Sequence, residues 1–170
     1  MKSTSVLGAL KTMGTNPRGD ANMDPRIERL KTVEACERFA VNATRLGRPD
    51  LADESRQRAV EIRAEAHGAK SAAEKECLQA IYAYEEVLTE KNGRRTRASR
   101  TWQMIDRHGI VEAVERAVNR PQETVGYTAL VEMGLQEYAF EAVILRHPDV
   151  FSEEAVSSSK QRLLDWSVET

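Results

Sequence analysis

The sequence has little of the residue types that build disulfides and metal sites. Its 170 residues include only two cysteines, Cys36 and Cys77, which are too few and too far apart for a disulfide framework or a zinc site. The histidines at 67, 108 and 147 are isolated, with no paired spacing typical of metal ligands. We therefore expect buried free thiols, as in a reducing compartment, and no bound metal or other cofactor.

Long apolar runs are also absent. The apolar run at positions 6–10 is shorter than the core of a signal peptide, and no segment approaches the ~20 apolar residues of a membrane span. The sequence therefore predicts a cytoplasmic protein that does not contact a membrane.

Motifs for catalysis and nucleotide binding are missing. There is no Gly-x-Gly or Gly-Lys-Ser sequence, which argues against a phosphate-binding loop. The serines at 157–159 have no adjacent histidine, and the two cysteines are expected to be inert because they lie at apolar helix positions. Glu137 and Glu141 follow a mixed face, so one of them is a candidate buried glutamate. We expect a non-enzymatic protein.

What the sequence does have is apolar spacing typical of helices, which predicts an all-α fold. Aromatic residues make up only 5%, so the core must be aliphatic and rich in alanine. Asp24 followed by Pro25 is a helix start, with an N-cap and then proline at the first helical position. The apolar stripe that follows predicts one helix that ends at Leu46.

Two further helices complete a predicted three-helix unit over residues 24–92. Asp50 can cap the second helix, which ends at Gly68. A Ser71-Ala-Ala-Glu capping box starts the third helix, which stops at Gly93, a residue suited to a left-handed C-terminus.

The first two of these helices contain small residues at regular positions. The relevant residues are Ala40, Ala52 and Ala59, with Leu46-Gly47 at the turn between the helices. This pattern resembles a single tetratricopeptide-like helical hairpin over residues 33–66. Arg56 and Ala64 depart from the family pattern, which usually has an aromatic residue and a proline there, and no second copy follows. The resemblance implies one antiparallel hairpin and favours a protein-binding role.

The C-terminal part contains two similar segments, 25 residues apart. When Gly109 is aligned with Gly134, Ser99 and Thr124 coincide as candidate N-caps, and several apolar positions match. We expect two helix–Gly-turn–helix copies, which form a compact set of short helices, and a closing helix over residues 152–167. The predicted organisation is a flexible segment 1–23, a helical unit 24–92, an arginine-rich link 93–100 and a compact helical unit 101–170.

The charges are unevenly distributed. Residues 1–93 have 15 basic and 15 acidic side chains, residues 94–120 have 7 and 3, and residues 121–170 have 3 and 9. All seven basic residues of the middle segment are arginines, and they are the candidate nucleic-acid-binding residues: Arg94, Arg95, Arg97, Arg100, Arg107, Arg116 and Arg120. Two interpretations remain open, because the arginines can face an external anion or pair with the acidic C-terminal segment.

The arginines precede and occupy a predicted helix–glycine–helix pair, so one hypothesis is a nucleic-acid-associated module. Phosphate contacts from the arginines would be joined by backbone amides at residues 99–101, and a helix could enter the major groove, as in helix-turn-helix proteins. This hypothesis predicts a DNA-binding component of a bacterial-type regulatory or DNA-processing system. The alternative is an adaptor or assembly protein that binds an acidic protein surface through the same arginines or a peptide along its helical hairpin, or that self-associates as a homo-oligomer through this hairpin.

Overall fold

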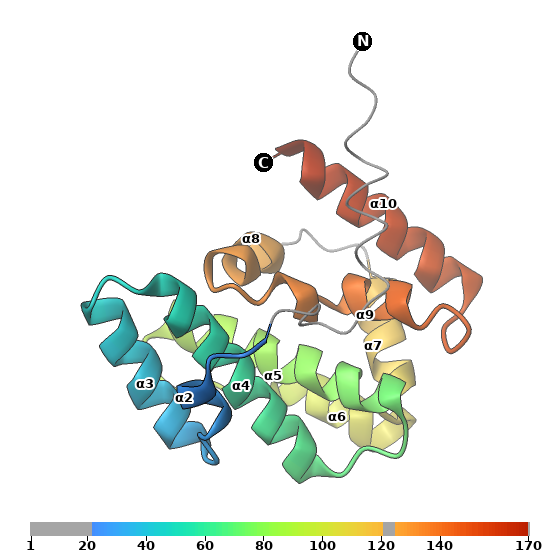
Figure 1. The fold of residues 1–170 in the computed structure, drawn as a ribbon. Coiled ribbons are helices and arrows are strands. Elements are labelled where there is room, and N and C mark those ends of the chain that lie inside the picture. Colours follow the sequence, from blue (N-terminus) through green and yellow to red (C-terminus); the bar gives the residue numbers. More distant parts are fainter. Residues whose placement is uncertain (1–21, 121–124, 170) are drawn as a thin grey trace.

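The computed structural model describes residues 22–120 and 125–169, and every regular element within these ranges is a helix, which confirms the all-α fold. The α-helices, with one 3-10 turn, are α2 (Pro25–Glu28), α3 (Val33–Arg45), α4 (Pro49–His67), α5 (Ala72–Asn92), α6 (Ser99–His108), α7 (Ile110–Val118), α8 (Val125–Glu132), η1 (Gln136–Tyr138), α9 (Phe140–Arg146) and α10 (Glu153–Glu169) (Figure 1). Positions 1–21 of the predicted flexible segment 1–23 lie outside the described residues. Met23, near its end, is buried.

The single helix predicted from Pro25 to Leu46 is wrong, because the chain breaks into α2 and α3. Thr32 has an extended backbone, with φ −128° and ψ 151°, and its side chain accepts a hydrogen bond from the Ala35 amide (3.2 Å). This N-cap starts a new helix and is incompatible with a continuous one. The start at Asp24 is confirmed, since its carboxylate accepts from the Arg26 amide (2.9 Å).

The ends of α4 and α5 agree only in part with those predicted from the sequence. The predicted cap at Asp50 is wrong, because α4 already begins at Pro49 and the Asp50 carboxylate instead binds the Arg48 guanidinium. The capping box of α5 is confirmed, since the Glu74 amide donates to Ser71 Oγ (3.1 Å). Two of the predicted glycine ends, at positions 68 and 93, have positive φ angles of 81° and 63°.

Helix α5 lies in the middle of the molecule, between the α2–α4 layer and the C-terminal helices (Figure 1). It contacts α4 as well as α7, α8, η1 and α9, so its buried residues belong to a core shared by both halves of the chain. Both cysteines are buried free thiols, as predicted. Burial raises the pKa of Cys77 to about 12 and also raises the pKa of Cys36, which keeps both thiols protonated at neutral pH.

The two predicted helix–glycine–helix copies differ in their turns. Gly109, with φ 87°, is the only residue between α6 and α7, whereas η1 follows Gly134 before α9 begins. A Cβ at position 134 would lie 2.5 Å from the Cβ of Asp53, so this turn packs directly on α4 and requires glycine. The candidate N-cap Thr124 lies outside the described residues. The predicted closing helix is confirmed as α10.

Of the two candidate buried glutamates, Glu141 is the buried one, and it has a structural partner. Its Oε1 accepts from Arg162 Nη1 at 3.1 Å, which joins α9 to α10. The other nitrogen of the same guanidinium donates to the backbone oxygen of Arg120 (2.6 Å), at the end of α7. The carboxylate is therefore used to hold Arg162, whose guanidinium joins α10 both to α9 and to the residues that follow α7.

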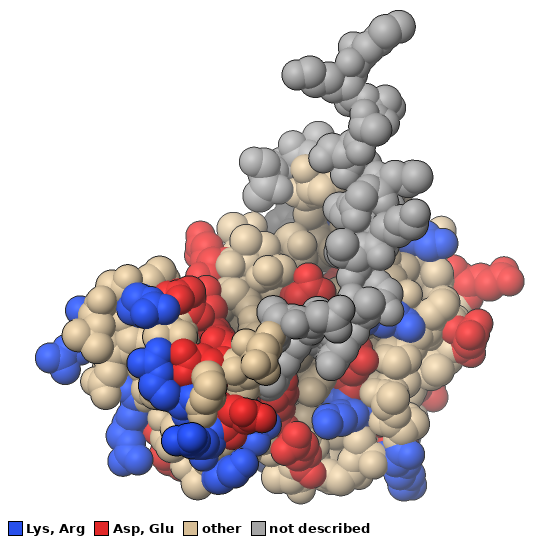
Figure 2. All heavy atoms as spheres, in the orientation of Figure 1, with Lys and Arg blue, Asp and Glu red and all other residues tan. Residues whose placement is uncertain are grey.

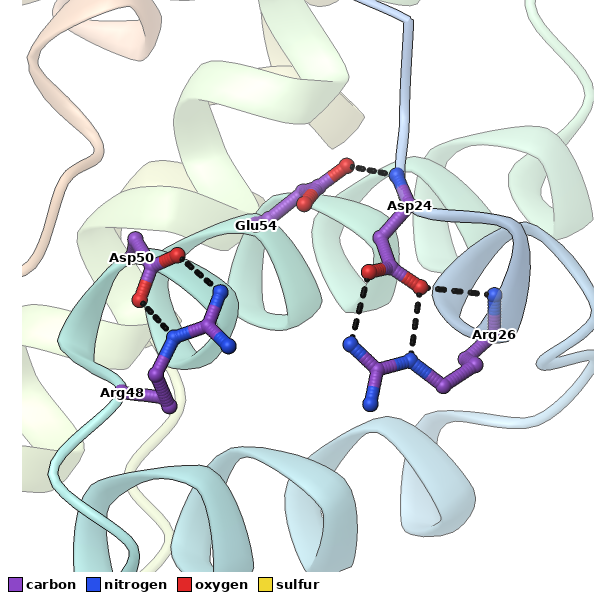
Figure 3. Close-up of polar contacts among 5 residues, drawn as sticks. All are labelled: Asp24, Arg26, Arg48, Asp50 and Glu54. Carbon is purple, nitrogen blue, oxygen red and sulfur yellow. Dashed lines mark hydrogen bonds and ion pairs between the residues drawn. The ribbon is translucent and has the colours of Figure 1, made fainter.

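The face over α2, α3 and α4 has intermingled basic and acidic side chains (Figure 2). Two arginines hold neighbouring aspartates through paired contacts: Arg26 binds Asp24 at 2.9 and 2.8 Å, and Arg48 binds Asp50 at 3.0 and 2.7 Å (Figure 3). Glu54 on α4 accepts from the Asp24 amide (2.5 Å), which ties the start of α2 to α4. Local ion pairs thus neutralise several of the charged side chains on this face.

Candidate nucleic-acid interface

The link at residues 93–98, between α5 and α6, bears three of the predicted arginines on a backbone with hydrogen bonds of its own. The amide of Thr96 donates to Thr89 Oγ1 on α5 (3.0 Å), and the hydroxyl of Thr96 donates to the backbone oxygen of Arg94 (2.8 Å). Asn92 Nδ2 also donates to the same hydroxyl oxygen at 3.2 Å. The link therefore follows a defined path.

Glu85 on α5 anchors the end of the link and the start of α6. Its Oε1 accepts from the Ala98 amide at 2.9 Å and from the indole nitrogen of Trp102 at 2.6 Å. Ala98 and Trp102 are both buried. One carboxylate thus satisfies two donors that burial would otherwise leave without a partner, and it fixes the direction in which α6 leaves the link.

Trp102 is also the centre of an aromatic cluster beneath the link. Its ring stacks on His67, with 5.0 Å between centroids, and lies 5.5 Å from the ring of Tyr82. The guanidinium carbon of Arg97 lies 5.1 Å from the centroid of the indole. This cation–π contact holds Arg97 against the protein although its side chain is exposed.

Five of the seven predicted arginines are exposed and have no carboxylate partner in residues 22–120 and 125–169. They are Arg94, Arg95 and Arg97 on the link and Arg100 and Arg107 on α6. Cations clustered without an anion repel one another, so a bound anion at this position is favourable. We call these five residues the arginine surface.

The two arginines of α6 lie on the same side of the helix. Arg100 and Arg107 are seven residues apart, which is two helical turns and ~10.5 Å along the axis. The opposite side of α6 is buried through Thr101 and Trp102. The candidate N-cap at Ser99 is wrong by one residue, because Ser99 is the first residue of α6 and Ala98 is its N-cap.

The other two predicted arginines, Arg116 and Arg120, already have partners. Arg116 binds Glu112 one turn earlier in α7, at 2.7 Å, and this hydrogen bond lowers the pKa of Glu112. Arg120 Nη2 lies 3.3 Å from the sulfur of Met104 on α6. Both arginines line an open hollow of about 880 Å³ that also contains Glu74 and other carboxylates, so its charge is mixed.

The acidic C-terminal segment does not pair with the arginine surface in the described residues. Its two carboxylates with ion pairs bind arginines of the same segment: Glu141 binds Arg162, and Glu137 lies 3.8 Å from Arg146. Arg146 also binds Glu76 on α5, at 2.6 Å. The ion pairs of this segment therefore join α9 to α5 and α10, and they leave the arginines of the link and α6 facing outward.

Within the described ranges, no group of histidine, cysteine and carboxylate side chains could hold a metal ion. The same residues contain no helix that is long and apolar enough to cross a membrane. Comparison of the chain with protein-family models, with curated proteins and with solved structures finds no match.

Proposed function

We propose that this protein is a non-enzymatic module that binds nucleic acid through the arginine surface. The observation that supports the proposal is the exposure of five arginines, all without a carboxylate partner in the described chain, around a link that Glu85 anchors. Guanidinium groups bind phosphate oxygens through two parallel hydrogen bonds, which suits a polyanion with closely spaced charges.

Binding would gain most of its free energy from the release of counterions. Each phosphate neutralised by an arginine frees condensed cations, so affinity falls steeply as salt rises, with a slope of about −0.9 per contact on a log–log plot. The preformed link reduces the entropy lost on binding, because its backbone is already held by Thr89 and Glu85.

The test is a fluorescence anisotropy titration of a labelled duplex of ~20 base pairs, about two helical turns. Arg94→Ala, Arg95→Ala and Arg100→Ala combined should weaken binding by about tenfold or more and reduce the salt slope by ~3. The matched control changes Arg29, Arg38 and Arg45 to alanine, since these arginines are also exposed and have no ion pair in the described residues. Equal losses for both triple variants, or no binding by the unmodified protein at ~50 mM salt, would rule the proposal out.

An adaptor role is the second candidate, supported by apolar residues that the α3–α4 hairpin leaves uncovered. Val41 is 60% exposed, and Leu46, at the turn after α3, is 79% exposed. A protein partner bound there would co-purify with the chain, and Val41→Ser with Leu46→Ser would release it. If the partner depends instead on the arginine surface and no nucleic acid binds, the adaptor role replaces the first proposal at that surface.

A further inference from the structure

The arginine surface has no exposed tryptophan, tyrosine or phenylalanine side chain available for stacking. The chain's two tryptophans, four tyrosines and three phenylalanines all lie in described residues, and none of them is in an exposed position. Trp102, the aromatic residue beneath the link, is only 6% exposed, and His67, Tyr82 and Arg97 contact its ring. Proteins that bind single strands rely on bases stacked on exposed aromatic rings, so this surface is not suited to a single strand.

Helix α6 instead has the position and the side chains of a helix that enters a groove. It packs mainly against α7 and buries only Thr101 and Trp102, so its other side faces away from the core. In Figure 1 it lies below and partly behind α5. Its ten residues span ~15 Å, and a helix ~10–12 Å in diameter fits the ~12 Å major groove of B-form DNA.

The exposed side of α6 combines phosphate-binding and base-reading residue types. Gln103 is exposed and lies between Arg100 and Arg107, three residues after the first and four before the second. Residues at this spacing share one side of a helix. Arginine pairs with guanine and glutamine with adenine at the edges that the major groove presents.

We infer that the ligand of the arginine surface is duplex DNA, that α6 lies in its major groove, and that Gln103 contacts base edges there. This inference rests on the proposed function. The arginines of the link, which precede the helix, contact the phosphates at the border of the groove. Double-stranded RNA is excluded as an equal ligand, because its major groove is too deep and narrow for a helix.

The first experiment compares three labelled probes of one sequence by anisotropy: duplex DNA, the single DNA strand and duplex RNA. Duplex DNA should bind at least about tenfold more tightly than either of the others. An equal affinity for the single strand overturns the duplex assignment, and an equal affinity for duplex RNA overturns the major-groove assignment, while the proposed function stands in both cases. No binding of any probe is the separate result that removes the proposed function.

The second experiment tests whether α6 lies in the groove by adding one negative charge to its exposed side. Gln103→Glu puts a carboxylate between the two arginines of α6 and should weaken duplex DNA binding by about tenfold. Gln161→Glu is the control for net charge, because Gln161 is exposed on α10; it also removes the hydrogen bond from Gln161 to Asp165. The control should change affinity by less than about twofold, and thermal unfolding of both variants checks that the fold is retained. Equal losses would show that only net charge matters and would overturn the role of α6.

Discussion

Arginines in two regions of this molecule have opposite surroundings. On the face formed by α2–α4, Arg26 and Arg48 are each held by an aspartate two positions away, and Arg63 bridges Glu37 on α3 and Glu86 on α5. On the link and α6, five arginines have no such partner in the described residues. Arg26, Arg48 and Arg63 are thus part of the structure of the α2–α4 region, where Arg29, Arg38 and Arg45 lack an ion pair, whereas all five arginines of the link and α6 lack one in the described residues.

The difference arises from the spacing of acidic residues along the chain and from which helices meet. Basic and acidic side chains are intermingled in the α2–α4 segment, as Figure 2 shows. Residues 94–111 contain five arginines and one histidine, and Asp106 is the only acidic residue among them. The half-buried carboxylate nearest the link, Glu85, binds an amide and an indole rather than an arginine. The arginines of the link and α6, which have no ion pair in the described residues, are therefore available to bind an anion.

Removal of a buried, ion-paired arginine should have the largest effect on stability. The side chain of Arg146 is only 4% exposed and binds Glu76, so Arg146→Ala leaves that carboxylate, among the described residues, with only the His147 ring, 3.1 Å away, and should lower the free energy of unfolding by about 3–5 kcal/mol. Urea unfolding measures the loss. Arg100→Ala removes the same charge from an exposed position and should stay within ~0.5 kcal/mol of the unmodified protein. Similar losses for both variants would show that buried, ion-paired arginines and exposed, unpaired arginines do not differ in their contribution to stability.

Loss of the Glu85 anchor should affect both stability and binding. Glu85→Ala leaves the Ala98 amide and the Trp102 indole without an acceptor, at a cost of about 2–3 kcal/mol in the free energy of unfolding. Because the variant is one charge more positive, electrostatics alone would strengthen nucleic-acid binding, whereas a loosened link should weaken it.

The control for this anchor is Glu90→Ala, which removes an exposed carboxylate from the same end of α5. It should leave stability nearly unchanged and strengthen binding slightly. If Glu85→Ala also strengthens binding in the anisotropy titration, the anchor does not position the arginines.

The unpaired arginines of α6 and the ion-paired Arg116 of α7 should differ in their effect on DNA binding. Arg100→Ala with Arg107→Ala should reduce the salt slope of duplex binding by ~2 and change stability by less than ~0.5 kcal/mol. Arg116→Ala should change the slope much less, because Arg116 is already bound to Glu112. An equal change of slope per arginine in both variants would mean that the ion pair opens on binding.

The sequence was sufficient for the features that depend on neighbouring residues. The Ser71 capping box, the glycine ends at 68 and 93 and the all-α class each follow from local rules, and the structure confirms them. The break before α3 was missed because the apolar stripe continues through it, although Thr32 is a suitable N-cap. The anchor at Glu85 had no local signal, since its two partners lie 13 and 17 residues away and meet it only when α6 packs on α5.

The smallest effect concerns the ion pair at the start of α2. The hydrogen bonds from Arg26 lower the pKa of Asp24 from 3.8 to about 2, so this carboxylate binds fewer protons in the folded chain than in the unfolded chain between these values. Its contribution to stability is therefore complete above pH ~4 and is lost as the pH falls toward ~2. Asp24→Asn keeps an N-cap without the charge, so the difference in melting temperature between it and the unmodified protein should shrink over that range. In an Arg26→Ala background the main cause of the lowered pKa of Asp24 is absent. The effect of Asp24→Asn on the melting temperature should then depend much less on pH. An undiminished dependence would mean that the charge of Asp24 is stabilised by the rest of the fold and not by its paired arginine.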